Sequence, residues 1–179
     1  MSDGRPNRNQ LYETALAQEG LFTTKQAAAA GYSTQLLYHL MKTGLVARTQ
    51  RGIYRLVHFP FGENEEFVAA WLWSEQAGVL SHSSALFLHG LSDVMPSKIH
   101  ITLPHAWRHR RFRVPQGVWL HFGDIPEADR AWSGSVPVTT PARTLADCAS
   151  DDISFELLTQ ATEQAIKRGL VEPSPRAAP

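Results

Sequence analysis

The chain has 179 residues, of which 43% are hydrophobic, enough to bury a core as one medium-sized domain or two small ones. No apolar run approaches the roughly 18 to 20 residues of a membrane-spanning helix, and the polar N-terminus lacks the apolar stretch of a secretory signal. The single cysteine, Cys148, excludes an internal disulfide and is expected to be buried rather than reactive. We therefore expect a cytoplasmic protein that makes no contact with a membrane.

Charge is distributed unevenly along the chain, although the formal net charge is zero. Residues 1–60 carry seven Lys or Arg against three Asp or Glu, a surplus of +4. The remaining residues carry ten basic and fourteen acidic side chains, which gives −4. Neutrality of the whole chain argues against a nucleic-acid partner, but the asymmetry favours an N-terminal region that binds anions and a second region with another role.

Short helices and a hairpin are predicted for the first 60 residues. Thr23 or Thr24 is the expected N-cap of the second helix, which Gly31 ends because glycine adopts the left-handed conformation at little cost. Ser33 caps the third helix and Gly44 ends it. A glycine also stands at the tip of the TQRG turn between two strands. The expected elements are helices over 8–18, 25–30 and 34–42 and strands over 45–48 and 53–57.

A second region of strands and helices is predicted beyond the junction HFPFGENEE. In this region Thr140 caps a helix whose first position is Pro141. The tail EPSPRAAP is rich in proline and alanine and is expected to be disordered. The expected elements are helices over 65–76, 83–90, 141–149 and 155–169 and strands over 98–104, 117–122 and 136–140. We predict an α+β protein with a winged helix-turn-helix domain over 1–60, a small mixed α/β domain over 61–170 and a tail over 171–179.

The winged helix-turn-helix prediction rests on element order, since three helices are followed by a two-stranded hairpin. The third helix has an apolar face of Leu and Met side chains and an opposite polar face. The start of a recognition helix usually reads base edges, so Thr34, Gln35 and Tyr38 are the expected base contacts. His39 and Lys42 are expected nearer to phosphates. The candidate DNA-binding residues are Thr24, Lys25, Ser33, Thr34, Gln35, Tyr38, His39, Lys42, Arg48, Arg51 and Arg55.

Three of these candidates lie on the predicted hairpin. Arg48, Arg51 and Arg55 would project from a two-stranded ribbon, and arginine in that position suits contact with the minor groove or with phosphates. The alternative is that the polar groups of the helix and the hairpin simply face solvent, as they do on any amphipathic helix.

Longer motifs connect the chain to a known family, from about residue 10 to about residue 150. GLFTTKQAAAAGYSTQLLYHLMKTGLVARTQRGIYRL resembles the N-terminal winged-helix domain of AbiEi-type antitoxins of bacterial type IV toxin–antitoxin systems. The resemblance continues through GVLSHSSALFLHGL, KIHITLP and VPVTTPARTLADCA. It implies a bacterial protein, associated with the nucleoid when bound to DNA, that represses its own operon and counteracts a toxin similar to nucleotidyltransferases.

Clustered serines and histidines in SHSSALFLHGL raise the question of a hydrolase. A Ser/His hydrolase needs a nucleophile on a strained turn and an oriented base, but the G-x-S-x-G pattern is missing. We expect helix-capping serines and a packed histidine instead. The eight histidines show neither H-E-x-x-H nor Cys/His pairing. His100 and His121 lie on alternating strands, for which simple exposure to solvent is the alternative to a metal site. We therefore predict no catalytic activity, no cofactor and no metal site.

The segment LPHAWRHRRFRVPQG places basic side chains beside aromatic ones between two predicted strands. Such a loop suits phosphate contact and stacking on bases or guanidinium groups. It is expected either to extend a DNA footprint or to bind an acidic partner, and a solvated loop is the alternative. The candidate residues are Arg108, Arg110, Arg111 and Arg113, around Trp107 and Phe112.

The sequence thus predicts a sequence-specific transcriptional repressor that is the autoregulating antitoxin of a type IV system. The expected partners are double-stranded DNA, as an inverted repeat in its own promoter, and a nucleotidyltransferase-like toxin. We also expect a homo-oligomer on DNA, since two-fold symmetry matches an inverted repeat. The alternative is a protein-interaction module, an antitoxin or adaptor whose C-terminal region binds a partner without specific DNA reading.

Overall fold

The structure is a computed structural model that describes residues 6–93, 96–151 and 153–173. The chain divides into two compact units, Met1–Gln76 (unit 1) and Ala77–Pro179 (unit 2), each with helices and its own sheet, which makes the protein α+β. The division differs from the boundary expected after residue 60, because the helix that follows the junction belongs to unit 1. Within the described residues no helix is long and apolar enough to cross a membrane. Residues 174–179 of the expected tail lie outside the described part of the chain.

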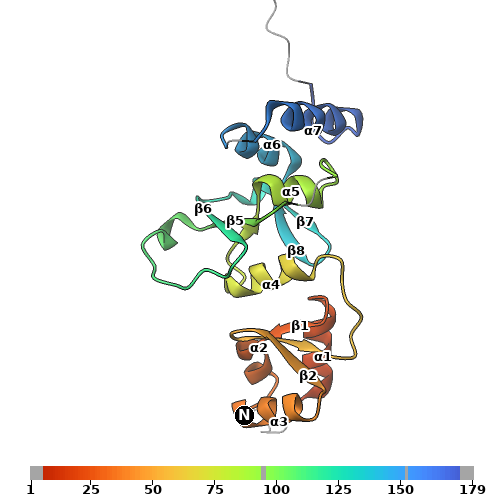
Figure 1. The fold of residues 1–179 in the computed structure, drawn as a ribbon, viewed down its shortest axis with the longest axis vertical. Helices are drawn as coiled ribbons and strands as arrows, with labels where there is room; N and C mark the ends of the chain where they lie inside the picture. Colours follow the sequence, from red (N-terminus) through yellow and green to blue (C-terminus); the bar gives the residue numbers. More distant parts are fainter. Residues whose placement is uncertain (1–5, 94–95, 152, 174–179) are drawn as a thin grey trace, which may run out of the picture. The chain divides into compact units, whose positions relative to one another are not determined.

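Unit 1 combines helices with an antiparallel sheet in the strand order β1-β3-β2 (Figure 1). Its elements are α1 (Arg8–Leu16), β1 (Leu21–Thr23), α2 (Thr24–Ala29), α3 (Thr34–Lys42), β2 (Val46–Gln50), β3 (Ile53–Leu56) and α4 (Glu65–Trp73). Periodicity in the sequence does not reveal β1, which has only three residues between two helices. Its pairing with β3 places Phe22 opposite Tyr54, and the two rings stack with a centroid distance of 5.8 Å.

Capping explains why the helices of unit 1 break where they do. Thr23 forms a capping box at the start of α2, so Thr23 rather than Thr24 is the cap. The Ser33 hydroxyl accepts a backbone N–H at the start of α3, as predicted. Gly31 and Gly44 follow the two helices with φ values of +83° and +72°. That conformation costs other residues roughly 1–2 kcal/mol, so glycine favours the two breaks.

Two of the four consecutive alanines at residues 27–30 pack in the core of unit 1. Ala27 and Ala30 are buried, whereas Ala28 and Ala29 are exposed. Because alanine side chains are short, α2 packs directly against both β1 and α3. The buried cluster consists of Leu11, Ala15, Phe22, Ala27, Ala30, Tyr32, Leu37, Val46 and Tyr54.

Unit 2 is built on a mixed sheet in the strand order β6-β5-β4-β8-β7. The pairs β5–β6 and β4–β8 are parallel, and β4–β5 and β7–β8 are antiparallel. The elements are β4 (Val79–Leu80), α5 (His82–Leu88), β5 (Ile99–Leu103), the 3-10 turn η1 (His105–Trp107), β6 (Val118–Phe122), the 3-10 turn η2 (Glu127–Asp129), β7 (Arg130–Ser133), β8 (Val136–Thr139), α6 (Pro141–Ala149) and α7 (Phe155–Lys167). Sequence patterns do not reveal β4, which has two residues, or β7, whose RAWS sequence lacks an apolar face.

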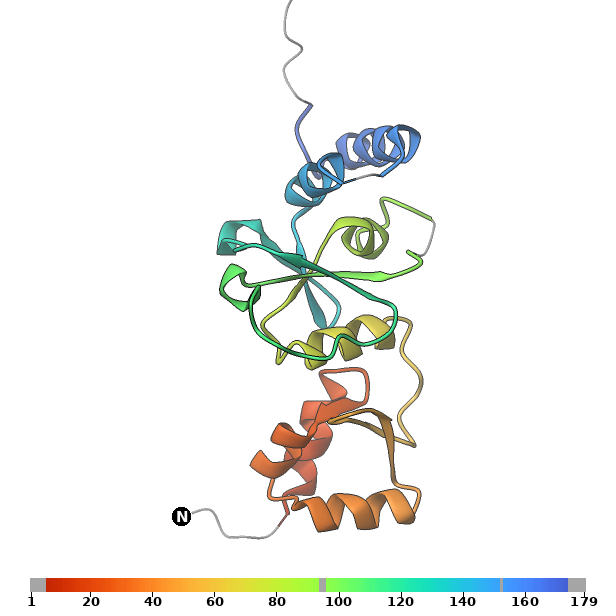
Figure 2. The ribbon, with the colours of Figure 1, turned by 60° about the vertical axis from the view of Figure 1, so that its left-hand side comes forward.

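The helices of unit 2 are stacked on its sheet in chain order (Figure 2). Helix α5 packs against β5, α6 packs against α5, and α7 packs against α6. Thr140 caps α6 and Pro141 begins it, as predicted. Burial raises the pKa of the Cys148 thiol to about 12, so this cysteine is a packing residue, also as predicted. The buried residues of this layer are Leu86, Leu91, Cys148, Ala161 and Ala165.

Candidate nucleic-acid interface

The outer face of α3 carries the polar side chains expected there. Leu37 is 1% exposed and holds the helix in the core of unit 1, while Leu36, Leu40 and Met41 pack against the same cluster. The opposite side chains are exposed, and Tyr38 leaves 56% of its surface to solvent. This α3 face consists of Thr34, Gln35, Tyr38, His39 and Lys42.

The start of α3 adds backbone donors to this face. Ser33 accepts the N–H of Leu36 with its hydroxyl at 3.2 Å and the N–H of Leu37 with its carbonyl at 2.9 Å. The earlier N–H groups of a helix have no intrahelical acceptor, and they lie at the positive end of the helix dipole. The first turn contains no acidic residue that would repel an anion. The N-terminus of α3 therefore suits a phosphate.

The start of α2 lies beside the turn of the hairpin. The backbone N–H and the hydroxyl of Thr24 both donate to the Gly52 carbonyl, at 3.0 and 3.3 Å. Lys25 and Arg51 are exposed and line the same surface hollow. The Lys25–Glu75 ion pair is long, at 3.9 Å, and solvent-exposed, so it contributes little to stability. The structure therefore brings two basic side chains that were predicted to bind DNA, Lys25 and Arg51, to the same hollow.

The hairpin does not protrude freely, in contrast to the prediction. The Gln50 side-chain amide donates to the Ala69 carbonyl of α4 at 3.3 Å, which ties the turn to that helix. Arg48 remains exposed, and its Nε donates to the Gln50 carbonyl at 3.4 Å. Arg48 and Arg51 therefore lie on a hairpin that is anchored to α4 through Gln50.

The prediction that Arg55 contacts DNA is wrong. Its side chain is 5% exposed, and its Nε lies 3.0 Å from the Glu65 carboxylate. Its Nη2 donates to the Phe59 carbonyl at 2.7 Å, and the Phe61 ring covers the guanidinium carbon at 3.7 Å. Arg55 therefore joins β3 to the start of α4. No local pattern reveals this role, because its partner lies in another element beyond the hairpin.

The predicted basic loop lies in unit 2, between η1 and β6. The Arg110 guanidinium stacks over the Trp107 ring at 4.3 Å, and the Trp107 and Phe112 ring centroids are 6.4 Å apart. This arrangement confirms that basic and aromatic side chains interleave in the loop. The exposed arginines are Arg108, Arg110, Arg111 and Arg113.

Histidines and serines of unit 2 differ from expectation in two places. Ser81 occupies the N-cap position of α5, but its side chain does not cap the helix. His89 is packed, as expected, with Nε2 2.7 Å from the Thr139 carbonyl, and burial lowers its pKa. His100 and His121 do not face solvent: both are half-buried, and their ring nitrogens lie 3.0 Å apart. Strand alternation indicates which residues share a face, but it does not indicate that α5 covers that face.

The two units correspond to two protein-family models. Residues 9–57 match a model described as a transcriptional regulator, AbiEi antitoxin, and residues 76–172 match the AbiEi antitoxin C-terminal domain. A search of curated proteins gave no match. A solved structure, the RV2827C protein from Mycobacterium tuberculosis, is similar at 17% identity over 86% of this chain and 69% of that chain, with a TM-score of 0.49. Since the C-terminal match alone covers more than half of the 179 residues, the chain belongs to the AbiEi antitoxin family.

Proposed function

We propose that this chain is a sequence-specific DNA-binding repressor and the autoregulating antitoxin of a type IV toxin–antitoxin system. Unit 1 acts as a winged helix-turn-helix, and the proposed toxin is nucleotidyltransferase-like. The observation that carries the proposal is the exposed polar α3 face, opposite the buried Leu37. The regulator family matched by residues 9–57 supports this role for unit 1.

In this proposal α3 is the recognition helix. The Gln35 side chain lies near the start of the helix, where it can donate to and accept from an adenine edge in the major groove. Thr34 and Tyr38 offer hydroxyl groups to neighbouring base edges. His39 and Lys42, nearer to the end of the helix, contact phosphates.

A second set of side chains positions unit 1 on the DNA backbone. These residues are exposed and contribute positive charge, hydroxyl groups or helix N-termini, all of which bind phosphates. Arg55 is excluded because Glu65 and backbone carbonyls occupy its guanidinium. The basic loop of unit 2 supplies a further patch for phosphate or an acidic partner. The proposed phosphate contacts of unit 1 are Thr24, Lys25, Ser33, Arg48 and Arg51.

A mobility-shift titration of the full chain tests the proposal. We expect the chain to bind a fragment from immediately upstream of its own operon more tightly than random DNA of the same length, at physiological salt. Footprinting is expected to protect an inverted repeat with half-sites about one helical turn apart. Equal affinity for the upstream fragment and for random DNA would refute sequence-specific repression.

Replacing Arg51 by alanine is expected to weaken binding to all DNA sequences about equally. Loss of one phosphate contact should reduce the slope of log K against log salt by about 0.9, because one fewer counterion is released. Mobility shifts at several salt concentrations measure that slope. Lys167→Ala removes one exposed positive charge from the end of α7 and serves as the control. An unchanged slope in Arg51→Ala would remove this residue from the interface.

The second candidate function is a protein-interaction module that does not read DNA. In this candidate the C-terminal region binds the partner, and the exposed arginines of the unit 2 loop, Arg108, Arg111 and Arg113, favour an acidic partner surface. The two candidates differ in the mobility-shift titration. An interaction module binds its partner protein without preferring its own upstream DNA.

A further inference from the structure

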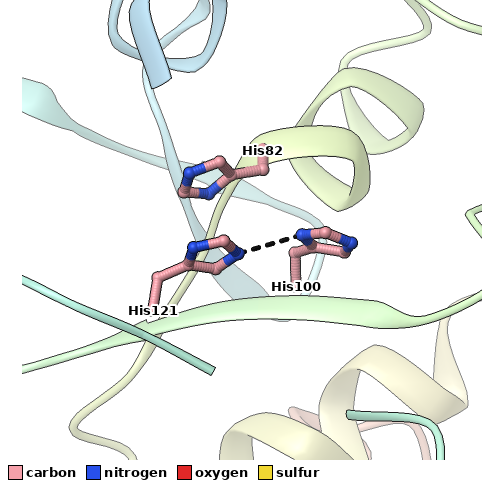
Figure 3. A group of neighbouring side chains, drawn as sticks. All are labelled: His82, His100 and His121. Carbon is pink, nitrogen blue, oxygen red and sulfur yellow. Dashed lines mark hydrogen bonds between the residues drawn. The ribbon is translucent and has the colours of Figure 1, made fainter. Parts of the chain in front are cut away.

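Histidines from three separate elements of unit 2 converge on one point (Figure 3). His82 is the first residue of α5, His100 lies in β5 and His121 lies in β6. One ring nitrogen of each can be chosen so that all three lie within 4.8 Å of one another. All three residues are half-buried. Such convergence of side chains that are distant in sequence is a property of metal sites.

The register of two parallel strands places two of these rings together. His100 pairs with Trp119, and Thr102 pairs with His121, so these side chains share one face of the sheet. Helix α5 begins over that face, where the Ser84 hydroxyl accepts the backbone N–H of His100 at 2.8 Å. The third ring therefore approaches from the helix.

The spacing of the rings suits a shared ion. Nδ1 of His100 and Nε2 of His121 are hydrogen-bonded at 3.0 Å, and a bound ion would replace the proton between them. Two imidazole nitrogens on one tetrahedral zinc, each at about 2.0–2.1 Å from the metal, are about 3.3 Å apart. The His82 ring stacks on the His121 ring with a centroid distance of 3.6 Å. Binding of one ion by all three rings requires the His82 ring to turn out of this stack, so that its lone pair points at the ion that His100 and His121 share.

Ser81 contacts the second ring nitrogen of His82. The Ser81 hydroxyl lies 2.9 Å from Nδ1 of His82 and accepts a hydrogen bond from the Thr102 hydroxyl at 2.8 Å. Ser81 is fully buried and does not cap α5, so its hydroxyl serves the histidine instead of the helix. In the tautomer whose Nδ1–H donates to the Ser81 hydroxyl, the lone pair lies on Nε2 and is available to a metal ion. Metal-binding histidines commonly have their second nitrogen fixed in this way.

Acidic side chains lie near the three histidine rings and favour a bound cation. Burial disfavours a charged imidazole and lowers the pKa of all three histidines. The negative charges of Asp147 and Asp151 act on His82 and His121. Oδ2 of Asp147 is buried and has no hydrogen-bond partner among the described residues. The other oxygen of Asp147, Oδ1, accepts from Arg143 Nε at 2.8 Å, so Asp151 is the acidic group whose charge a divalent cation would offset.

We propose that His82, His100 and His121 bind a divalent transition-metal ion, with Zn²⁺ as the ion that three imidazoles favour. The three ligands leave a fourth coordination position for water or for a donor from a partner. Metal binding would link α5 to β5 and to β6, which is an edge strand of the sheet. This site is independent of the α3 face, so its test does not depend on DNA binding.

Calorimetric titration of the untagged, chelator-treated full chain with ZnCl₂ tests the proposal. We expect one ion per chain in wild type and loss of this stoichiometric site in His121→Gln and in His82→Gln. Ser81→Ala, which removes the positioning hydroxyl, is expected to weaken zinc binding roughly 10- to 100-fold. His109→Gln removes an exposed histidine of the same unit and should bind zinc like wild type.

A spectroscopic measurement on wild type avoids dependence on variants that fold poorly. Addition of ZnCl₂ should shift the imidazole NMR signals of His82, His100 and His121 and leave those of His105 and His109 in place. With CoCl₂, visible d–d bands typical of low coordination number are expected. Absence of a stoichiometric site in wild type, or equal loss of binding in His109→Gln and His121→Gln, overturns the proposal.

Discussion

Gln35→Ala is expected to reduce the discrimination between the operator and random DNA by roughly 1–3 kcal/mol, the usual value of one well-placed base contact. The side chain is exposed near the start of α3 and makes no contribution to the buried cluster of unit 1. The substitution should therefore leave folding intact and reduce the affinity for specific DNA alone. Competition mobility shifts with operator and random fragments measure the difference.

A matched control for this prediction lies in unit 2. Gln160 is an exposed glutamine on α7, so Gln160→Ala repeats the chemical change away from the α3 face. It should alter neither specific nor random binding. If Gln35→Ala weakens both kinds of DNA equally, the amide contacts the backbone and another residue of α3 reads the bases.

Arg55→Ala is expected to lower the free energy of unfolding of unit 1 by about 3–5 kcal/mol. The substitution leaves the Glu65 carboxylate without its partner at 3.0 Å and the Phe59 carbonyl without its 2.7 Å donor. The Arg55 and Glu65 side chains are 6% and 16% exposed, so water compensates little for the loss. Urea denaturation followed by circular dichroism, with amide hydrogen exchange to assign the change to unit 1, measures the effect.

Arg48→Ala is the control for Arg55→Ala, because Arg48 is an exposed arginine on the same hairpin. An exposed substitution of this kind changes stability by no more than about 0.5 kcal/mol. We expect Arg48→Ala to weaken DNA binding without destabilising unit 1. Arg55→Ala should destabilise unit 1, while the molecules that remain folded keep their affinity for DNA. Equal stabilities of the two variants would contradict the buried ion pair.

Local features of the fold were predictable because their causes lie within a few residues. Ser33 and Thr140 accept N–H groups only three residues ahead, so each cap can be recognised from a short segment. The spacing of the leucines in α3 fixes its buried face in the same way. The short strands were not predictable, because β4 forms only where Leu80 meets Ile101 and Val138 from distant segments.

The candidate site shows the same limit. The exposed face of α3 follows from helical periodicity, which needs no knowledge of the neighbouring elements. Arg55 looks like its neighbour Arg48 in the sequence, and it is buried only because α4 folds over β3 and supplies Glu65. His100 and His121 look like solvent-facing strand residues, and they meet His82 only because α5 covers their face.

By itself, then, the sequence determined the helix breaks, the polar face of α3 and the family of the chain. Each of these depends on a local pattern of residue types. Only the tertiary structure decided which polar side chains are free to bind and which are buried. The free energy of a guanidinium or an imidazole depends on its burial and on its neighbours, and the fold brings those neighbours from elsewhere in the chain.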